Sequence, residues 1–194
     1  MSTTFVLYGG KTSIDSSAND EFFRQSIDLV EKNTIHIVLC YWARPRERWD
    51  ALAERNKKSI TKQTSKYVKF SITKDIADLY TQLEHADVLY VEGGEAELIE
   101  PYLPQLLGLK EKLQDKVYLG SSMGAFIVAT HYVLSLSPQK ENTVHHGLGL
   151  LPISVLCHWN VEKKKGLKMD LLRKEDARLP ILLLDEQKFA TFVF

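Results

Sequence analysis

Ser122 stands at the centre of the sequence Gly120-Ser121-Ser122-Met123-Gly124. An apolar run precedes it and a helix-like segment follows it, so the pattern G-x-S-x-G falls in the strand-turn-helix context of a nucleophile elbow. Such a turn needs small flanking residues, and it projects Ser122 toward a helix N-terminus whose backbone N–H groups can stabilise a developing oxyanion. A serine that only caps the helix is the alternative. The pattern therefore predicts Ser122 as a nucleophile.

A serine hydroxyl needs a base to take its proton, and histidine is the usual one at neutral pH. The chain has six histidines, of which only His158 follows a predicted strand, 153–157, beyond the elbow. Ligands of open α/β sheets bind beyond the carboxyl ends of the strands. We therefore predict His158 as the base, with His145 and His146, in a turn-rich stretch, as the runners-up.

A carboxylate should orient that histidine and stabilise its charged form. Asp185 and Glu186 follow the next predicted strand, 181–184, at the same edge of the sheet. Glu141 lies between Ser122 and His158 and is the other candidate. The residues alone leave the choice among these acids open.

A glycine pair, Gly93-Gly94, follows the predicted strand 88–91 and is flanked by Glu92 and Glu95. Paired glycines let a backbone approach a ligand closely, although a simple turn is the alternative. The N–H groups of Gly94 and Met123 would together hold an oxyanion. A phosphate-binding loop is disfavoured, because no Lys-Ser/Thr follows and Glu95 would repel phosphate.

The segments that must position these residues alternate between apolar strand-like runs and helical stretches. This order predicts a mostly parallel sheet with helices on both faces, which is a three-layer αβα sandwich. We expect 125–134 to begin a helix, and 185–188 to form a hairpin between the last two strands. The strand-like runs are 5–8, 35–40, 67–72, 88–91, 116–119, 153–157, 181–184 and 189–194.

The composition fits one soluble catalytic domain over 1–194. A chain of 194 residues with 44% hydrophobic residues can bury a sizeable core without disulfides or metals. Its 25 basic and 25 acidic residues balance, which argues against a nucleic-acid or anionic-membrane surface as the main partner. No apolar stretch approaches the roughly 20 residues that span a bilayer. We expect a cytoplasmic protein, and a homodimer is compatible with these features.

The two cysteines, Cys40 and Cys157, both follow apolar runs, and we expect buried thiols. Two cysteines make neither a disulfide framework nor a zinc pattern. Because the chain also lacks a dinucleotide fingerprint, we predict no metal and no cofactor.

Four segments resemble the aspartyl dipeptidase (peptidase E) and cyanophycinase family of serine peptidases. They follow that family's order and spacing over nearly the whole chain: Leu-Tyr-Val-Glu-Gly-Gly (89–94), Gly-Ser-Ser-Met-Gly-Ala (120–125), Gly-Leu-Gly-Leu-Leu-Pro (147–152) before His158, and Leu-Asp-Glu-Gln (184–187).

This resemblance implies a class I glutamine amidotransferase-like fold of flavodoxin-like topology, with serine where those enzymes use cysteine. It implies a triad of Ser122, His158 and Glu186, with Glu141 kept as the alternative acid. It also implies cleavage of peptide bonds next to aspartyl residues in small peptides.

The chain departs from this family at two positions. Glu95 stands where the family usually has asparagine, and Met123 replaces alanine after the nucleophile. A carboxylate at Glu95 would oppose an aspartyl side chain unless it meets the α-amino group of the substrate. Nearby arginines, read otherwise as a solvated helix start, could offset its charge: Arg44, Arg46 and Arg48.

Two other functions stay open from the sequence. An α/β-hydrolase esterase would use the chain order Ser122, Glu141, His158, although the short chain and the strands after His158 count against it. A non-catalytic binding protein on the same fold is the other alternative, because fold does not guarantee function.

Overall fold

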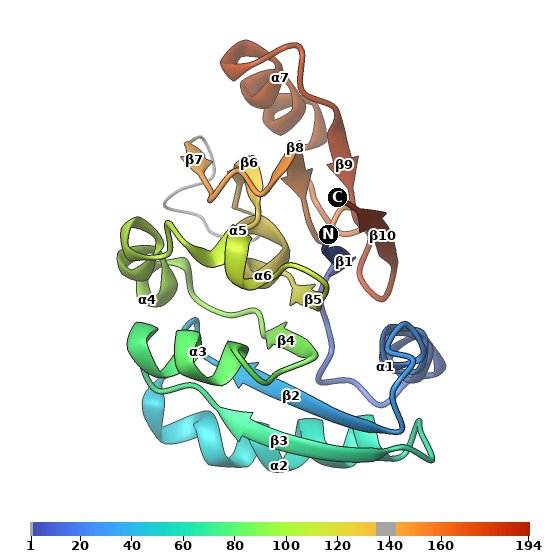
Figure 1. The fold of residues 1–194 in the computed structure, drawn as a ribbon. Helices are drawn as coiled ribbons and strands as arrows, with labels where there is room; N and C mark the ends of the chain where they lie inside the picture. The colour runs from blue at the N-terminus through green and yellow to red at the C-terminus, as the bar shows by residue number, and fades with distance from the viewer. Residues whose placement is uncertain (1, 135–142) are drawn as a thin grey trace.

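The computed structural model describes residues 2–134 and 143–194, and the strands of these residues form two sheets (Figure 1). The larger sheet has six strands in the order β10-β1-β5-β4-β2-β3. Five of them are parallel, and β10 pairs antiparallel with β1 at one edge. The strands are β1 (Thr4–Tyr8), β2 (Thr34–Cys40), β3 (Tyr67–Ile72), β4 (Val88–Val91), β5 (Val117–Ser121) and β10 (Phe189–Val193).

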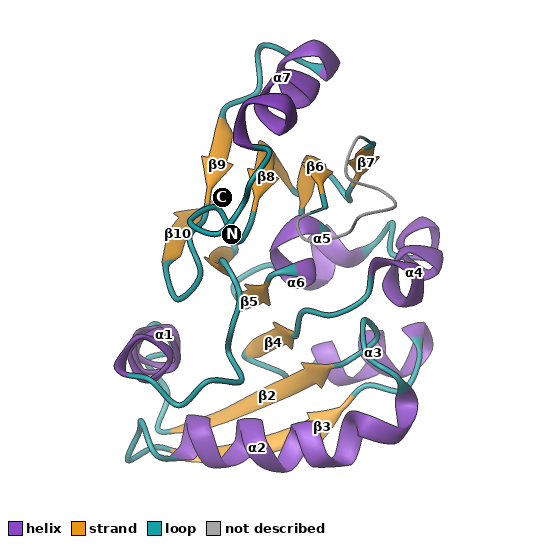
Figure 2. Cartoon of the chain, turned by 180° about the vertical axis from the view of Figure 1, so that it is seen from behind, coloured by secondary structure: helices purple, strands orange, loops and turns teal. Residues whose placement is uncertain are grey.

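Helices cover both faces of the larger sheet (Figures 1 and 2). The strand order runs outward from β1 to β3 and then back through β4 to β5. Right-handed crossovers therefore bring α1 and α2 to one face and α3 and α5 to the other, and α1 contacts α2 while α3 contacts α5. The helical elements are α1 (Ser17–Asp28), η1 (Arg46–Arg48), α2 (Trp49–Thr61), α3 (Ile76–Leu83), α4 (Ala96–Ile99), η2 (Glu100–Gln105) and α5 (Leu109–Lys112).

The predicted α/β fold with a mostly parallel sheet is therefore confirmed. Among the residues that the structure describes, every helix is too short or too polar to cross a lipid bilayer.

The second sheet has four strands in the order β7-β6-β8-β9, and the sequence analysis did not anticipate it. The pairs β6–β8 and β8–β9 are parallel, whereas β6–β7 is antiparallel. Helix α7 contacts β6 and β7. These elements, with the short helix that precedes them, are α6 (Met123–Phe126), β6 (Ala129–Val133), β7 (Val144–His146), β8 (Leu151–Leu156), α7 (Lys165–Glu175) and β9 (Ile181–Leu183).

Two expectations for the second half of the chain are wrong. The helix expected in 125–134 ends at Phe126, because the β-branched and aromatic run of β6 finds partners in β7 and β8. The segment 185–188 is a turn, with the amide of Lys188 donating to the carbonyl of Asp185 at 3.2 Å. It is not a hairpin, since β9 pairs with β8 and β10 pairs with β1.

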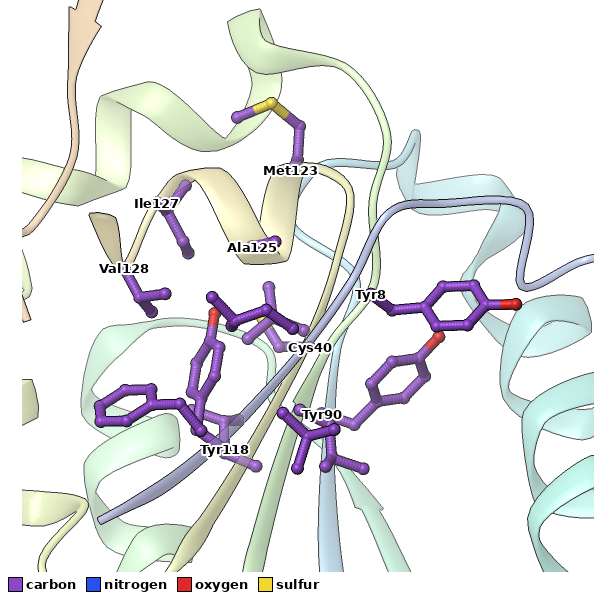
Figure 3. Packing of buried hydrophobic residues seen from close by; sticks show 14 of the residues in the cluster. Tyr8, Cys40, Tyr90, Tyr118, Met123, Ala125, Ile127 and Val128 are labelled. Atoms are coloured by element: carbon purple, nitrogen blue, oxygen red, sulfur yellow. The ribbon is translucent and has the colours of Figure 1, made fainter. Parts of the chain in front are cut away.

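The central strands are buried on both faces, as parallel strands covered by two helical layers should be. Every residue of β4 and β5 is buried. Figure 3 shows Ala125 and Ile127 packed over this core beside Tyr118. The Tyr118 hydroxyl donates to the Gly124 carbonyl at 2.7 Å. This bond ties α6, and with it the turn before α6, to the centre of the sheet.

Candidate active site

Ser122 lies in the turn between β5 and α6, with φ 51° and ψ −106°. Such an angle is strained for a non-glycine residue, and it is typical of a nucleophile elbow. A Cβ at Gly120 would lie 2.4 Å from the carbonyl oxygen of Gly124, and one at Gly124 would lie 2.2 Å from that of Val91. Both glycines are therefore required by close packing. The Ser122 amide donates to the Tyr8 carbonyl at 2.9 Å, which fixes the turn to β1.

His158 lies directly after β8 and reaches Ser122. The two residues are joined by a contact of 3.1 Å between Ser122 Oγ and His158 Nε2. The His158 amide donates to the Gly9 carbonyl at 3.2 Å. A Cβ at Gly10, which has φ 120°, would lie 2.3 Å from the imidazole ring. The glycine pair after β1 therefore makes room for the histidine.

Glu186 lies in the turn after β9 and approaches the other side of the imidazole. Its Oε1 lies 2.8 Å from His158 Nδ1, and each of the two side chains is 13% exposed. The Glu186 amide donates to Asn160 Oδ1 at 2.8 Å, which orients the turn. A carboxylate accepts only, so Nδ1 carries the proton and Nε2 is left to accept from Ser122.

The other predicted acids and histidines do not join this group within the described residues. Asp185 makes no hydrogen bond to His158, although it precedes Glu186 directly. Glu141 lies outside the described residues. The runner-up His145 is held elsewhere, with its Nδ1 2.7 Å from Glu100 Oε1. His146 lies beside it on β7.

The glycine pair after β4 packs closely against the elbow. A Cβ at Gly93 would lie 2.7 Å from the Cβ of Ser122, and one at Gly94 would lie 2.0 Å from the carbonyl oxygen of Ala43. Neither the amide of Gly94 nor that of Met123 donates to another residue that the structure describes. Both N–H groups are free to act as oxyanion donors.

A buried carboxylate that the sequence analysis did not single out supports this loop. The side chain of Glu92 is 1% exposed and lies 2.6 Å from Arg55 Nη2 and 3.7 Å from Arg44 Nη2. Its second oxygen accepts from the Asn56 side chain. A charge at this depth needs such partners. The signal in the sequence was a glutamate at the end of an entirely apolar strand.

The pocket beside Ser122 and His158 has a volume of about 360 Å³. Three of its lining side chains are charged: Lys11, Arg44 and Glu95. The predicted Glu95 therefore lies in the pocket, together with two cations. This volume is at the lower end of the range for ligand sites, which is roughly 300–1,000 Å³. The pocket suits a small substrate that carries both signs of charge.

Backbone strain is concentrated around this pocket. Each non-glycine residue with positive φ costs about 1–3 kcal/mol and persists only where its surroundings enforce it. Lys11, Ser122 and His158 line the pocket, and Gln187 follows Glu186. The described non-glycine residues with positive φ are Lys11, Asp115, Ser122, His158 and Gln187.

The cysteines Cys40 and Cys157 are buried thiols, as predicted. The Cys157 thiol donates to the Ser122 carbonyl at 3.8 Å. Burial raises the pKa of Cys40 to about 12 and also raises the pKa of Cys157, which directly precedes His158. A thiol with a raised pKa stays protonated and is a poor nucleophile. The Ser122 hydroxyl, by contrast, lies 3.1 Å from the imidazole and is the candidate nucleophile.

Comparison with known proteins gives one family and one fold. A family model described as Peptidase family S51 matches residues 5–192. The structure is similar to that of a peptidase from an acI-B1 Actinobacterium, with a TM-score of 0.68 and 18% identity over 98% of this chain and 83% of that chain. It is also similar to a Listeria monocytogenes EGD-e protein named as a peptidase E, with a TM-score of 0.64 and 17% identity over 100% of both chains. No curated protein matches the chain by sequence. The structural likenesses confirm the predicted class I glutamine amidotransferase-like fold.

Proposed function

The chain belongs to peptidase family S51 and is a serine peptidase, and we propose that it cleaves short peptides at aspartyl residues through Ser122, His158 and Glu186. The observation that carries this proposal is the continuous contact from hydroxyl to imidazole to carboxylate. The two distances, 3.1 Å and 2.8 Å, are within hydrogen-bonding range. The three side chains also follow the carboxyl ends of three strands, β5 of the larger sheet and β8 and β9 of the smaller one, where ligands of α/β folds bind.

In the first half of the reaction, Ser122 Oγ attacks the carbonyl carbon of the scissile bond and gives its proton to His158 Nε2. The carbonyl oxygen becomes an oxyanion, which accepts from the N–H groups of Gly94 and Met123. Glu186 accepts from Nδ1–H and stabilises the imidazolium. His158 then gives its proton to the amine of the leaving group, the C–N bond breaks, and the acyl-enzyme remains.

In the second half, a water molecule takes the place of the departed amine. His158 Nε2 takes a proton from this water as it attacks the acyl carbon, and the same two N–H groups hold the new oxyanion. The ester bond to Ser122 Oγ breaks, and the serine oxygen recovers its proton from His158. The products are a free carboxylate and the original enzyme.

The charges of the pocket support an N-terminal aspartyl residue as the group recognised. Its β-carboxylate complements Arg44 and Lys11, and its α-ammonium complements Glu95. Glu95, which stands where the resembled family usually has asparagine, would then take part in substrate recognition. Arg44 is 30% exposed and lies 3.7 Å from Glu92, so it can meet a substrate while its position is held from behind.

Hydrolysis of a dipeptide panel tests this function. We expect kcat/KM for Asp-Leu to exceed that for the isosteric Asn-Leu by about 10–100-fold, because a charge-assisted bond contributes about 1.5–3 kcal/mol. Leu-Leu should be a still poorer substrate. Ser122→Ala should lower turnover by at least about 10⁴-fold while the circular dichroism spectrum stays unchanged. Turnover that survives in Ser122→Ala would refute the proposed nucleophile.

The role of Glu95 is tested with the same panel. Glu95→Gln should lower kcat/KM for Asp-Leu about 10-fold and leave N-acetyl-Asp-Leu, which has no ammonium group, unaffected. Glu31→Gln removes another exposed carboxylate and is the matched control. Equal turnover of Leu-Leu and Asp-Leu would contradict the proposed aspartyl specificity, although the chain would still be a serine peptidase. Turnover of esters alone would favour an esterase.

A further inference from the structure

A second group of polar side chains lies on β6, β7 and α7, and α7 contacts both strands. Figure 1 labels these three elements. His131 on β6 and His146 on β7 are directly opposed across the antiparallel pair. Glu175 is the last residue of α7, which contacts both strands. None of these three residues lines the pocket beside Ser122. The group is therefore separate from the proposed catalytic residues.

The three side chains present their donor atoms to one common point. One ligand atom from each residue lies within 4.8 Å of the other two. The rings of His131 and His146 meet edge-on, with centroids 5.0 Å apart. His146 Nε2 lies 3.8 Å from Glu175 Oε1, which is too long for a hydrogen bond. Direct bonding among the three residues does not account for their approach.

His131 adds a second and independent observation. It is 8% exposed, and its Nδ1 is buried without a hydrogen-bond partner among the described residues. A buried ring nitrogen without a partner is costly, and each such group in a native protein calls for an explanation. A metal ion bound at Nδ1 would provide one, because ligation satisfies this nitrogen and orients the ring.

Two imidazoles and one carboxylate are a ligand set typical of zinc sites with an open position. Bonds of about 2.0–2.1 Å in tetrahedral geometry hold ligand atoms about 3.3 Å apart. The donor atoms, which lie within 4.8 Å of one another, must therefore close by up to about 1.5 Å. The side chains of His146 and Glu175 are 68% and 40% exposed, so they can move toward the buried His131. We propose that His131, His146 and Glu175 bind one Zn²⁺ ion, with water as the fourth ligand.

The neighbouring Asp176 is not counted as a ligand. Its two carboxylate oxygens lie 2.9 Å from the Arg178 guanidinium, which holds the pKa of Asp176 at about 2. This carboxylate already has its partner. Glu175 has no comparable bond among the described residues beyond the long approach to His146. The ion would tie the edge strand β7 to the end of α7 and would keep one position open to water.

Zinc binding to the chelator-treated protein tests the proposal. Isothermal titration with ZnCl₂ should give one site per chain in the wild type. His146→Ala and Glu175→Gln should each weaken that site by at least about 10-fold, and both change exposed residues that the folded chain can lose. His85→Ala removes an exposed histidine in the turn before β4 and is the matched control. His158→Ala removes the histidine that lies beside Ser122 and Glu186, and zinc binding should persist in it.

A second measurement follows the effect of the ion on the fold. At a Zn²⁺ concentration a hundred times its Kd, the Tm of the wild type should rise by about 5–10 °C. That rise should be absent in His146→Ala and present in His85→Ala. Unchanged zinc affinity in both His146→Ala and Glu175→Gln would overturn the site, as would loss of binding in His158→Ala alone. These outcomes are independent of whether the chain cleaves aspartyl peptides.

Discussion

The proposed catalytic residues come from both sheets, and the strands that precede these residues differ in how deeply they are buried. Ser122 and the glycine pair follow β5 and β4, whose residues are all buried in the large core. His158 and Glu186 follow β8 and β9 of the smaller sheet, and β9 has no buried residue. A separate small core cluster packs there, formed by Val133, Leu156 and Leu172.

The end of β1 joins these two unequal parts. The Tyr8 carbonyl accepts from the Ser122 amide, the Gly9 carbonyl from the His158 amide, and the Gly10 carbonyl from the Gln187 amide, at 2.9, 3.2 and 3.2 Å. Three consecutive residues thus hold the nucleophile, the base and the turn of the acid. Buried strands, β5 and β8, precede Ser122 and His158, whereas β9 before Glu186 has no buried residue, so the turn of Glu186 depends most on its backbone hydrogen bond to Gly10.

We expect the largest effect from removing the contact between Ser122 and His158, which joins the two sheets. His158→Ala should lower kcat/KM by at least about 10⁴-fold, as Ser122→Ala does, because each substitution removes a member of one proton-transfer unit. The double variant should lose little more than either single variant. Steady-state kinetics on Asp-Leu measures all three. Losses that multiply in the double variant would contradict a shared unit.

A smaller effect separates the two acids of the turn after β9. Glu186→Gln keeps the shape of the side chain but removes its charge, and it should lower kcat by about 10²–10⁴-fold by leaving the imidazolium without its carboxylate. Asp185→Asn, the adjacent control, should change kcat less than about 3-fold. If Asp185→Asn caused the greater loss, the assignment of the acid would be wrong.

We expect the smallest effects from glycine-to-alanine substitutions, one in each part of the molecule, which change the free energy of unfolding. Gly120→Ala puts a Cβ 2.4 Å from the Gly124 carbonyl oxygen, and it should lower the free energy of unfolding by about 1–3 kcal/mol. Gly166→Ala, in α7, meets nothing within 4 Å and should raise that energy by about 0.5–1 kcal/mol. Urea denaturation measures both. The same sign in both variants would show that local packing does not govern these positions.

The sequence predicted the parts of this molecule that depend on local signals. Short apolar runs marked β1, β2, β4 and β5, and the glycines around Ser122 marked the elbow, because its tight turn admits few other residues. His158 was predicted as the base from its place after a strand, and the structure brings its Nε2 within 3.1 Å of Ser122 Oγ. Glu186 could not be separated from Asp185 and Glu141 by the residues alone, because which carboxylate reaches the imidazole depends on the tertiary structure.

The predictions that failed concern elements and residues whose partners are distant in the sequence. The run 129–133 is apolar enough for a helix or a strand, and pairing with β7 and β8 decides between them. The same pairing brings His131 opposite His146, and α7 adds Glu175, so no spacing rule could have found that group. Glu92 was missed for the same reason, because its partners Arg55 and Asn56 come from α2.

The attachment of three segments to β1 also has a consequence for synthesis on the ribosome. β1 is made first, yet its neighbour β10 and the turn of Glu186 emerge last among the described elements. Contacts of such long sequence separation form slowly. A nascent chain in which Ser122 has emerged still lacks His158 and Glu186. Both are in place only after the turn that carries Glu186 has folded against the end of β1. The proposed triad is therefore completed only after the turn that carries Glu186 has been made.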